Sequence, residues 1–483
     1  MKTISMSVFE ENLNSAKKIL NETAFVKTKY FSAFGKGAVL FYSDGVTDTP
    51  LIDRFIVEPL ENAKKSLVIS EKLIEKTLPH SELTFNKTLE TAILQVFDGD
   101  CLILFDGAKF FLNVGSKKWE KRAVAEPPTS SVVKGPREGF TEDLMTNISL
   151  IKRKLKTPSL KFDFTEKGRF TRSKIAIVYI DEIAKKSVVD KIKMRIEEID
   201  IDGVLDSSYL REHLQERKFS VFRQIGDTEK PDVLAAKLLE GRIGIIVDGT
   251  PIVLTLPYII FEDFQAADDY YSIPYAAAFL RVLRLMSMIV GVFMPGFYVA
   301  AQSFHLQFIP LRLVLTIASA VKGIPLSANI EMLFTLFIFE LLNEASIRMP
   351  RYVGMALSVV GALVLGDTAV RAGIVSTPTI LIMALSGIAV YAVPDERSTL
   401  SLMRLVFLLL SGSLGLIGLV SGTVVVSIYL ARLANYDSPY LAPYAPNVKN
   451  DLNDGLLKSP VTITNTRPDA IPNKNKKRLI WKN

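Results

Sequence analysis

The sequence predicts an α/β soluble region made of two similar subdomains, followed by a polytopic α-helical membrane domain. Three observations favour this fold class. The chain has 483 residues, more than one ordinary domain needs. Residues 1 to about 270 mix charged and apolar positions as globular proteins do, whereas residues 285–431 hold long apolar runs. Two stretches of the N-terminal half, 99–115 and 241–257, also match each other without a gap.

The two matching stretches read GDCLILFDGAKFFLNVG and GRIGIIVDGTPIVLTLP. Each predicts a hairpin with Asp-Gly in a two-residue type I′ turn, which needs positive φ at both central positions. A strand and a helix precede each hairpin, in KGAVLFYSDGVTDTPLIDRFIVEPLENAKK and in SKIAIVYIDEIAKKSVVDKIKMRIEEI. We therefore expect similar subdomains at 20–120 and 165–262; the alternative is that unrelated α/β units share such patterns.

Between them, residues 121–164 predict a linker and a basic helix. The first part is rich in Pro, Ser and Gly, and TEDLMTNISLIKRKLK predicts a helix with Thr141 as its N-cap. Its last turn carries a basic cluster. These side chains would either lie on anionic lipid headgroups or form the solvated end of a helix. They are Lys152, Arg153, Lys154 and Lys156.

The soluble region has no pattern typical of an enzyme. The three histidines have no metal-binding spacing, and no GxxxxGK[ST] phosphate loop occurs. FGKGAVL at 34–40 lacks a third glycine and precedes a strand, so it fails as a dinucleotide fingerprint. We expect no catalysis, no metal and no cofactor. Cys101, the single cysteine, lies in the apolar run DCLILF and predicts a buried, inert thiol.

The membrane domain is expected at 280–432, with four to six membrane helices. A first span at 285–304 carries a predicted kink at Pro295. The run at 311–322 is too short to cross comfortably and predicts a re-entrant or interfacial helix. Further apolar segments cover 330–350, 353–375, 377–393 and 405–431. Small residues in them are expected to permit close helix packing, namely Gly361, Gly366, Gly412, Gly415 and Gly418.

Flanking charge predicts the orientation of the chain. The first residues show no apolar core of a cleaved signal, so the first span is expected to direct insertion. Arg281 and Arg284 precede that span, which favours a cytoplasmic soluble region. The Pro/Asn-rich tail, 433–483, lies on a side that depends on whether 311–322 crosses. We expect lipid contacts and no nucleic-acid partner.

Charges inside the apolar segment IEMLFTLFIFELLNEASIRMP are candidates for function, because a carboxylate in hydrocarbon is costly. Glu340, Glu344 and Arg348 follow each other at i, i+4 and i+8, so they form one stripe. Glu344 is placed to pair with Arg348, which leaves Glu340 without a partner in its own helix, so that it would face either water in a pore or a basic group on a neighbouring helix. The stripe would face water in a pore or a partner, or would only fix helix register.

Two other features concern charges in the same region. Asp367 and Arg371 repeat the i, i+4 arrangement of acid and base in GDTAVRAG. Glu331, near a helix start, is expected simply to suit the helix dipole. No nucleophile and base come together in these segments, which disfavours an intramembrane enzyme.

Several blocks together resemble the A-subunit family of spore germinant receptors. They are KGPREGFTEDLMTNISLIKRKL, the long stretch from IPLSANIEMLFTLFIFELLNEASIRMP to GDTAVRAGIVSTP, and DSPYLAPYAP. The resemblance covers about residues 20 to 446. It implies an inner-spore-membrane receptor with a permease-like B subunit, which would hold the nutrient, and a lipoprotein C subunit. It also implies a ring of A subunits that acts as a nutrient-gated cation channel, lined by Glu340 and Glu344. Asp367 departs from the family pattern, where an uncharged residue is expected.

Two alternatives remain beside the channel. A non-conducting scaffold would transmit nutrient binding from the permease-like partner. A secondary transporter would need two corresponding broken helices, and the short 311–322 run has no matching partner. The nutrient itself is not encoded here, because its site is expected on another chain.

Overall fold

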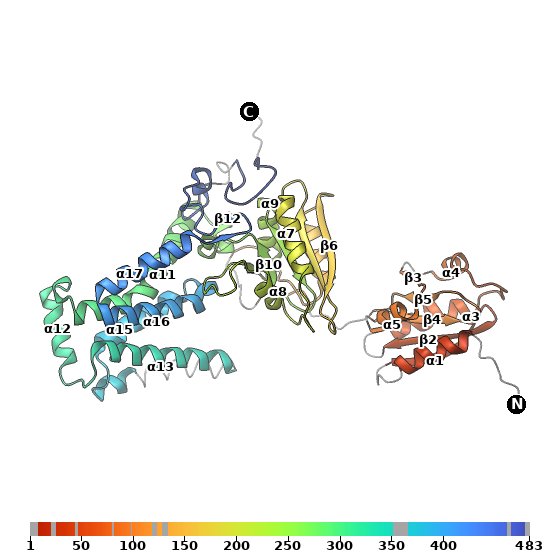
Figure 1. The fold of residues 1–483 in the computed structure, drawn as a ribbon, viewed down its shortest axis with the longest axis horizontal. Coiled ribbons are helices and arrows are strands. Elements are labelled where there is room, and N and C mark those ends of the chain that lie inside the picture. The colour runs from red at the N-terminus through yellow and green to blue at the C-terminus, as the bar shows by residue number, and fades with distance from the viewer. Residues whose placement is uncertain are drawn as a thin grey trace. The chain divides into compact units, whose positions relative to one another are not determined.

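The computed structural model describes residues 8–20, 26–43, 47–79, 82–97, 99–117, 123–127, 134–350, 366–460 and 465–478. The chain divides into two compact units, Met1–Arg122 and Ala123–Asn483 (Figure 1). The first unit holds one α/β subdomain. The second unit holds another α/β subdomain, a helical region and the C-terminal tail.

The first subdomain is a five-stranded antiparallel sheet with helices on both faces. The strand order is β1-β2-β4-β5-β3. The strands are β1 (Val26–Ala33), β2 (Lys36–Ser43), β3 (Leu83–Asn86), β4 (Cys101–Phe105) and β5 (Phe111–Val114). One face packs against α1 (Val8–Leu20) and α5 (Leu89–Phe97). The other face packs against α2 (Thr49–Leu51), η1 (Ile52–Val57), α3 (Glu58–Glu61) and α4 (Glu71–Thr77).

Burial on both faces explains the uninterrupted apolar run of the central strand β4, since a strand covered on one side only would alternate. Every residue of β4 is buried. Cys101 begins this strand, and burial raises the pKa of its thiol to about 12. The thiol therefore stays protonated near neutral pH.

The second subdomain repeats this architecture. Its five-stranded antiparallel sheet has the order β6-β7-β9-β10-β8. The strands are β6 (Leu160–Lys167), β7 (Ser173–Ile180), β8 (Gly226–Thr228), β9 (Ile243–Val247) and β10 (Val253–Leu256). One face packs against α7 (Lys186–Glu197) and α8 (Ser207–Leu214), the other against α6 (Leu144–Lys154) and α9 (Pro231–Glu240). The predicted α/β region of two similar subdomains is confirmed.

The prediction of two-residue type I′ turns is wrong in both copies. The strands end earlier, so the connections run over 106–110 and 248–252. Of each Asp-Gly pair only the glycine has positive φ, +81° at Gly107 and +92° at Gly249. The aspartates instead extend the sheet, because the amides of Asp106 and Asp248 donate to the carbonyls of Gly37 and Lys174 at 2.9 Å.

The predicted N-cap of the basic helix also needs correction. Asp143, not Thr141, caps α6, and its carboxylate accepts from the amide of Thr146 at 2.7 Å. Thr141 is buried and donates through its amide and hydroxyl to Asn147 Oδ1. Its side chain is therefore already engaged. α6 packs with Leu144 and its other apolar residues on the second sheet, so it is part of that subdomain and not of a linker.

The basic end of α6 makes local contacts. Arg153 and Lys154 pair with Glu138, the latter at 3.6 Å. Lys152 lies 5.2 Å from the ring centre of Phe162 in β6. These contacts fit the solvated helix end better than a free lipid-binding cluster.

The helical region begins with the long helix α11 (Pro274–Ser303), which continues through Pro295. It also holds α12 (Leu311–Val321), α13 (Ala328–Arg348), α15 (Thr377–Val390), α16 (Arg397–Leu414) and α17 (Leu416–Ala431). Short segments connect or flank these helices: η2 (Ile260–Phe264), α10 (Ala267–Tyr270), η3 (Leu306–Phe308) and η4 (Pro394–Glu396). Most of the predicted segment 353–375 lies outside the described residues.

Among the described residues, two helices are long and apolar enough to cross a membrane, Pro274–Ser303 and Pro394–Leu414. Shorter apolar helices are Leu311–Val321, Thr377–Val390 and Leu416–Ala431. The expected four to six membrane helices are therefore matched only in part by length and composition. The segment 405–431, predicted as one run, is broken at Gly415, whose φ of +63° ends α16.

The termini of the helices meet at two opposite ends of a bundle. At one end Phe304, which follows α11, lies against Gly415, and Asn329 at the start of α13 lies against Gly412. At the other end the Tyr391 hydroxyl, just after α15, bonds to Asn343 in α13. α13 and α15 therefore run in the same direction, since Glu331 and Ser376 meet at their starts and Asn343 and Tyr391 at their ends. α12 lies at the end that Phe304 and Gly415 occupy.

The tail after α17 returns to the second α/β subdomain. It contains β11 (Ala434–Asn435), β12 (Ser438–Pro439) and η5 (Lys449–Asn453). Tyr436 is buried in the core of that subdomain and donates its hydroxyl to Leu214 O at 2.8 Å. Asn473 pairs as an isolated β-bridge with Ala184. The tail and the second subdomain thus lie at the same end of the bundle, which the sequence left open.

Candidate functional site

Glu340 on α13 pairs with a basic group on a neighbouring helix, which is one of the two alternatives that the sequence left open. Arg404 on α16 donates to Glu340 Oε1, and Ser401 one turn earlier donates to the same oxygen. The Arg404 side chain is 1% exposed and that of Glu340 36%. The acid is therefore neutralised by a neighbouring helix while one side of it stays accessible.

The arginine ties four helices together. Its Nη1 donates to Ser386 Oγ on α15 at 3.1 Å, and Ser386 in turn donates to Gly291 O on α11 at 2.6 Å. The ring of Phe339 lies 5.7 Å from the guanidinium carbon. Removing one partner of a fully buried pair typically costs about 3–5 kcal/mol, because the other charge is left uncompensated. The cost here is lower, since solvent reaches Glu340. The network fixes how α11, α13, α15 and α16 are arranged.

Sequence reasoning missed Arg404 because only partners within one helix can be read from spacing. The arginine lies 64 residues after Glu340, and the predicted segment 405–431 began one residue after it. A signal was present, since Arg404 interrupts the apolar run LMRLVFLLL. An intramembrane arginine is itself a reason to search for an acid.

Glu331 has a larger structural role than suiting the dipole of its own helix. It is fully buried. Its Oε1 accepts from the amide of Ser376 at 2.5 Å and from the Ser376 hydroxyl at 2.6 Å. Ser376 directly precedes α15, so Glu331 places a carboxylate at the N-terminus of a second helix, where free amides favour negative charge. The contact ties α13 to α15.

The two predicted intrahelical pairs lie on exposed surface. Arg348 Nη2 is 2.5 Å from Glu344 Oε1, and Arg371 Nε is 2.9 Å from Asp367 Oδ2. All four side chains are more than half exposed. Exposed pairs contribute little to stability in water, roughly 0–1 kcal/mol. Glu344 and Arg348 continue the Glu340 stripe along an open face of α13, away from Arg404.

The five candidate packing glycines differ in their surroundings. A Cβ at Gly418 would clash with the carbonyl of Leu410, so the α16–α17 hairpin needs glycine there. Gly412 and Gly415 lie against Asn329 and Phe304. A Cβ at Gly366 would meet no described atom within 4 Å. Gly361 lies outside the described residues.

The arginines at the start of α11 are not free. Arg284 Nη1 and Arg281 Nε lie 2.7 and 3.3 Å from Asp269 Oδ2, and Arg281 Nη1 lies 3.0 Å from Asp454 Oδ1 in the tail. Arg281 and Asp269 are almost completely buried. These arginines therefore join α11 to α10 and to the tail, besides flanking the predicted first span.

A second charged cluster joins the α/β subdomain to α16. Arg223 Nη1 lies 3.5 Å from Asp263 Oδ1 and also pairs with Asp227. Tyr258 donates to Asp263 and contacts Glu396 at 3.2 Å, one residue before α16. Burial raises the pKa of Asp263 well above its ordinary value, which Arg223 offsets only in part. The cluster therefore links the second subdomain to the residue that precedes α16.

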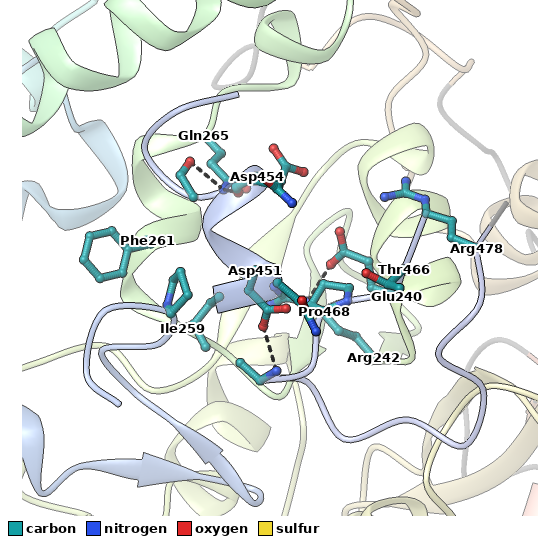
Figure 2. A pocket seen from close by; sticks show the side chains of 15 residues that line it. Glu240, Arg242, Ile259, Phe261, Gln265, Asp451, Asp454, Thr466, Pro468 and Arg478 are labelled. Atoms are coloured by element: carbon teal, nitrogen blue, oxygen red, sulfur yellow. Dashed lines mark hydrogen bonds and ion pairs between the residues drawn. The ribbon is translucent and has the colours of Figure 1, made fainter. Parts of the chain in front are cut away.

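A small hollow lies where the tail crosses the second subdomain (Figure 2). Its polar side chains mostly bond to each other or to backbone. Arg242 Nε donates to Glu240 at 3.2 Å, and the Asp451 carboxylate accepts from the amides of Asp469 and Ala470 at 2.8 Å. The dashed contacts in Figure 2 therefore describe a packed seam and not a preformed ligand site.

Comparison with known proteins assigns the family. The family model of the Bacillus/Clostridium GerA spore germination protein matches residues 11–470. Spore germination protein KA of Bacillus subtilis (strain 168) is 37% identical over 444 residues, covering 91% of this chain and 81% of that protein. Uncharacterized membrane protein YfkQ of the same organism is 33% identical over 464 residues, covering 95% and 90%.

Among solved structures, the crystal structure of the N-terminal domain of the A subunit of the Bacillus megaterium spore germinant receptor GerK3 matches at 26% identity. The match covers 53% of this chain and 97% of that one, with a TM-score of 0.21. The family match over residues 11–470 and the 37% identity to protein KA confirm the resemblance noted in the sequence. The chain belongs to the GerA family of spore germination proteins.

Proposed function

We propose that this chain is the membrane-embedded A subunit of a nutrient-responsive spore germinant receptor, and that copies of it form a nutrient-gated cation channel. The observation that carries the channel is the open stripe on α13. Glu340, Glu344 and Arg348 lie on one accessible face of a helix whose other residues are largely apolar. Acidic groups at such a face favour cations over anions.

The large exposed apolar surface of the two longest apolar helices supports membrane insertion of the helical region. Only 22% and 28% of their apolar stretches are buried within the chain. The core helix of a soluble protein would be mostly covered, so this exposure supports our proposal that lipid or further subunits cover these surfaces. The name of YfkQ, a membrane protein, agrees with this.

The return of the tail to the second subdomain leads us to propose an even number of membrane crossings. The second subdomain precedes α11 and the tail follows α17, and the two share a core through Tyr436. Both must then lie on one side of the bilayer, for which we propose the cytoplasmic, spore-core side of the inner spore membrane. α12 would lie at the opposite side without crossing.

The family further suggests partners, a permease-like B subunit and a lipoprotein C subunit. In this proposal the B subunit holds the nutrient and this chain performs no catalysis. The clusters around Arg223 and Asp269 would carry movement between the soluble subdomain and α16 or α11.

Charge removal on α13 tests the pore. Spores carrying Glu344→Gln are expected to assemble receptors normally but to release cations more slowly after nutrient addition, because a negative charge is lost from the open stripe. Asp367→Asn is the matched control, since it removes an equally exposed i, i+4 pair from another segment. Glu340→Gln should have the same effect and should also loosen the contact with Arg404.

If both glutamate variants assemble and release ions at the wild-type rate, α13 does not line the pore. The scaffold then becomes the better explanation. It is favoured by the bond between Tyr258 and Glu396, which gives a direct mechanical route into α16. Electrical recording of the reconstituted oligomer separates the two, because a scaffold carries no current.

A further inference from the structure

The loop between α8 and β8 is held against the ends of two apolar helices. Arg217 in this loop donates to Arg432 O at the end of α17 at 3.1 Å, and its guanidinium lies 5.6 Å from the ring centre of Tyr429. Thr399 near the start of α16 donates to Val221 O at 3.2 Å. The loop therefore lies where the apolar surfaces of α16 and α17 end.

Hydrogen bonds between residues of the loop itself hold its conformation. The side chain of Gln224 is fully buried, accepts from the Arg217 amide at 3.0 Å and donates to the Arg217 carbonyl at 2.8 Å. The Ser220 amide donates to the same carbonyl at 3.2 Å. The turn thus has a fixed shape, and the side chains at its tip are held outward by the backbone.

The tip is apolar and basic. Phe219 is 99% exposed and Val221 45%. Lys218 beside them is also exposed. A phenylalanine so fully exposed on an ordered turn has no packing role within the described residues. The exposed apolar side chains of α17, which include Val425 and Ile428, lead toward this turn and end at Tyr429.

We propose that the tip Arg217–Val221 inserts into the headgroup region of an anionic bilayer and anchors the second α/β subdomain to the membrane surface. Phe219 would enter the boundary of the acyl chains, and Lys218 would contact lipid phosphates. Aromatic and basic side chains together are typical of the membrane interface. The inference rests on the proposed insertion of the helical region in the membrane.

The position of the loop favours lipid over a protein partner. The loop is continuous with the exposed apolar surfaces of the helices. It lies at the C-terminal end of α17, where the apolar residues of that helix give way to Arg432 and where Arg217 of the loop contacts it. A bilayer has this same sequence of apolar interior and charged boundary. A neighbouring subunit would cover the same residues, and the experiment must separate it from lipid.

The test uses the buried thiol of Cys101, which leaves a newly introduced cysteine as the reactive one. Full-length protein with Val221→Cys carries an environment-sensitive fluorophore in nanodiscs of phosphatidylcholine and phosphatidylglycerol. Some lipids bear a spin label near the headgroup, which quenches nearby fluorophores. We expect strong quenching that falls several-fold with Phe219→Ser, and falls with Lys218→Gln or when phosphatidylglycerol is omitted.

Two further labels make the result decisive. Phe170→Cys in the β6–β7 turn is the negative control, because this phenylalanine is 83% exposed and its turn packs beside Gly203 of the same subdomain. Val425→Cys on α17 is the positive control, quenched by labels deeper in the acyl chains.

Quenching at Val425 but not at Val221 would overturn the anchor while leaving the membrane insertion intact. Protection of Val221 from a water-soluble quencher without lipid quenching would assign the loop to a protein contact, which also overturns it. If neither position is quenched by lipid, the membrane insertion itself fails.

Discussion

The two α/β subdomains share one architecture but differ in which parts of the chain contribute to their hydrophobic cores. Each consists of a helix, two strands, two helical segments, a strand, a helix and two strands, with the same strand order. The core of the first contains described residues of its own segment alone. The core of the second also contains Tyr436, a residue of the C-terminal tail. The two subdomains thus have the same fold, and the second has additional contacts that join it to the helical region.

The difference is located in loops and helix faces and not in the sheet. In the second copy the α8–β8 loop reaches α16 and α17, and α7 contacts the tail through Arg195 and Tyr436. Loops tolerate such specialisation because changing them leaves the strand pairing intact. Two of the following four predictions use the first subdomain as an internal control for the second, and the other two change residues that only the second has at its contacts with the tail and with the helical region.

Removing the tail residue from the second core should have the largest effect. Tyr436→Ala is expected to destabilise the second unit by about 3–5 kcal/mol, as for other large buried aromatic side chains. Tyr436→Phe should cost only about 1 kcal/mol, since it loses one hydrogen bond. Thermal unfolding of the full-length protein in detergent, followed by circular dichroism, measures both. Equal stability of Tyr436→Ala and wild type would show that the tail is not part of the core.

A matched pair of core substitutions tests whether the two units unfold separately. Leu40 in β2 and Ile177 in β7 occupy equivalent buried positions. Replacement of either by alanine is expected to cost about 2–5 kcal/mol. Leu40→Ala should accelerate alkylation of the Cys101 thiol by about 30-fold or more when opening limits labelling, whereas Ile177→Ala should leave it unchanged. Acceleration by both variants would mean that the units unfold together.

Substitution of the two equivalent aspartates, Asp106 and Asp248, should change stability by smaller and unequal amounts. Asp248 Oδ1 accepts from the Leu144 amide at the start of α6 at 3.0 Å, while the Asp106 side chain is exposed. Asp248→Ala is expected to destabilise the second unit by about 1 kcal/mol, because a helix-terminal amide loses its acceptor. Asp106→Ala should be almost neutral. Denaturant midpoints of the two variants give the comparison, and the opposite ranking would contradict it.

The smallest effect concerns pH. Burial alone would raise the pKa of Glu262, but Arg242 and Lys237, at 2.8 and 2.9 Å, hold it below its ordinary value of 4.5. A lowered pKa in the folded state adds stability above the ordinary value, and this stability is lost as pH falls through the lowered pKa. The second unit should therefore lose stability below pH 4.5, and Glu262→Gln should show a shallower loss. A variant that keeps the full pH dependence would exclude this carboxylate as its source.

Patterns along the chain predicted much of the fold because they depend on neighbours in sequence. The repeated Asp-Gly hairpins predicted the two similar subdomains, and spacing at i, i+4 identified the pairs Glu344–Arg348 and Asp367–Arg371. The turn type was wrong because Asp106 and Asp248 extend the sheet by bonding to a neighbouring strand. Thr141 fits the sequence pattern of an N-cap, but in the structure its side chain bonds to Asn147 and Asp143 caps the helix.

The sequence by itself determined the division into an α/β region and an apolar helical region, the repeat within the first, and the acids placed on α13. Local periodicity and composition suffice for these, because each element must bury its own apolar face. The tertiary structure decided that Arg404 neutralises Glu340, that Glu331 caps α15, and that the tail returns to the second subdomain. These contacts join residues dozens to hundreds of positions apart, and only the packing of the helices and sheets brings them together.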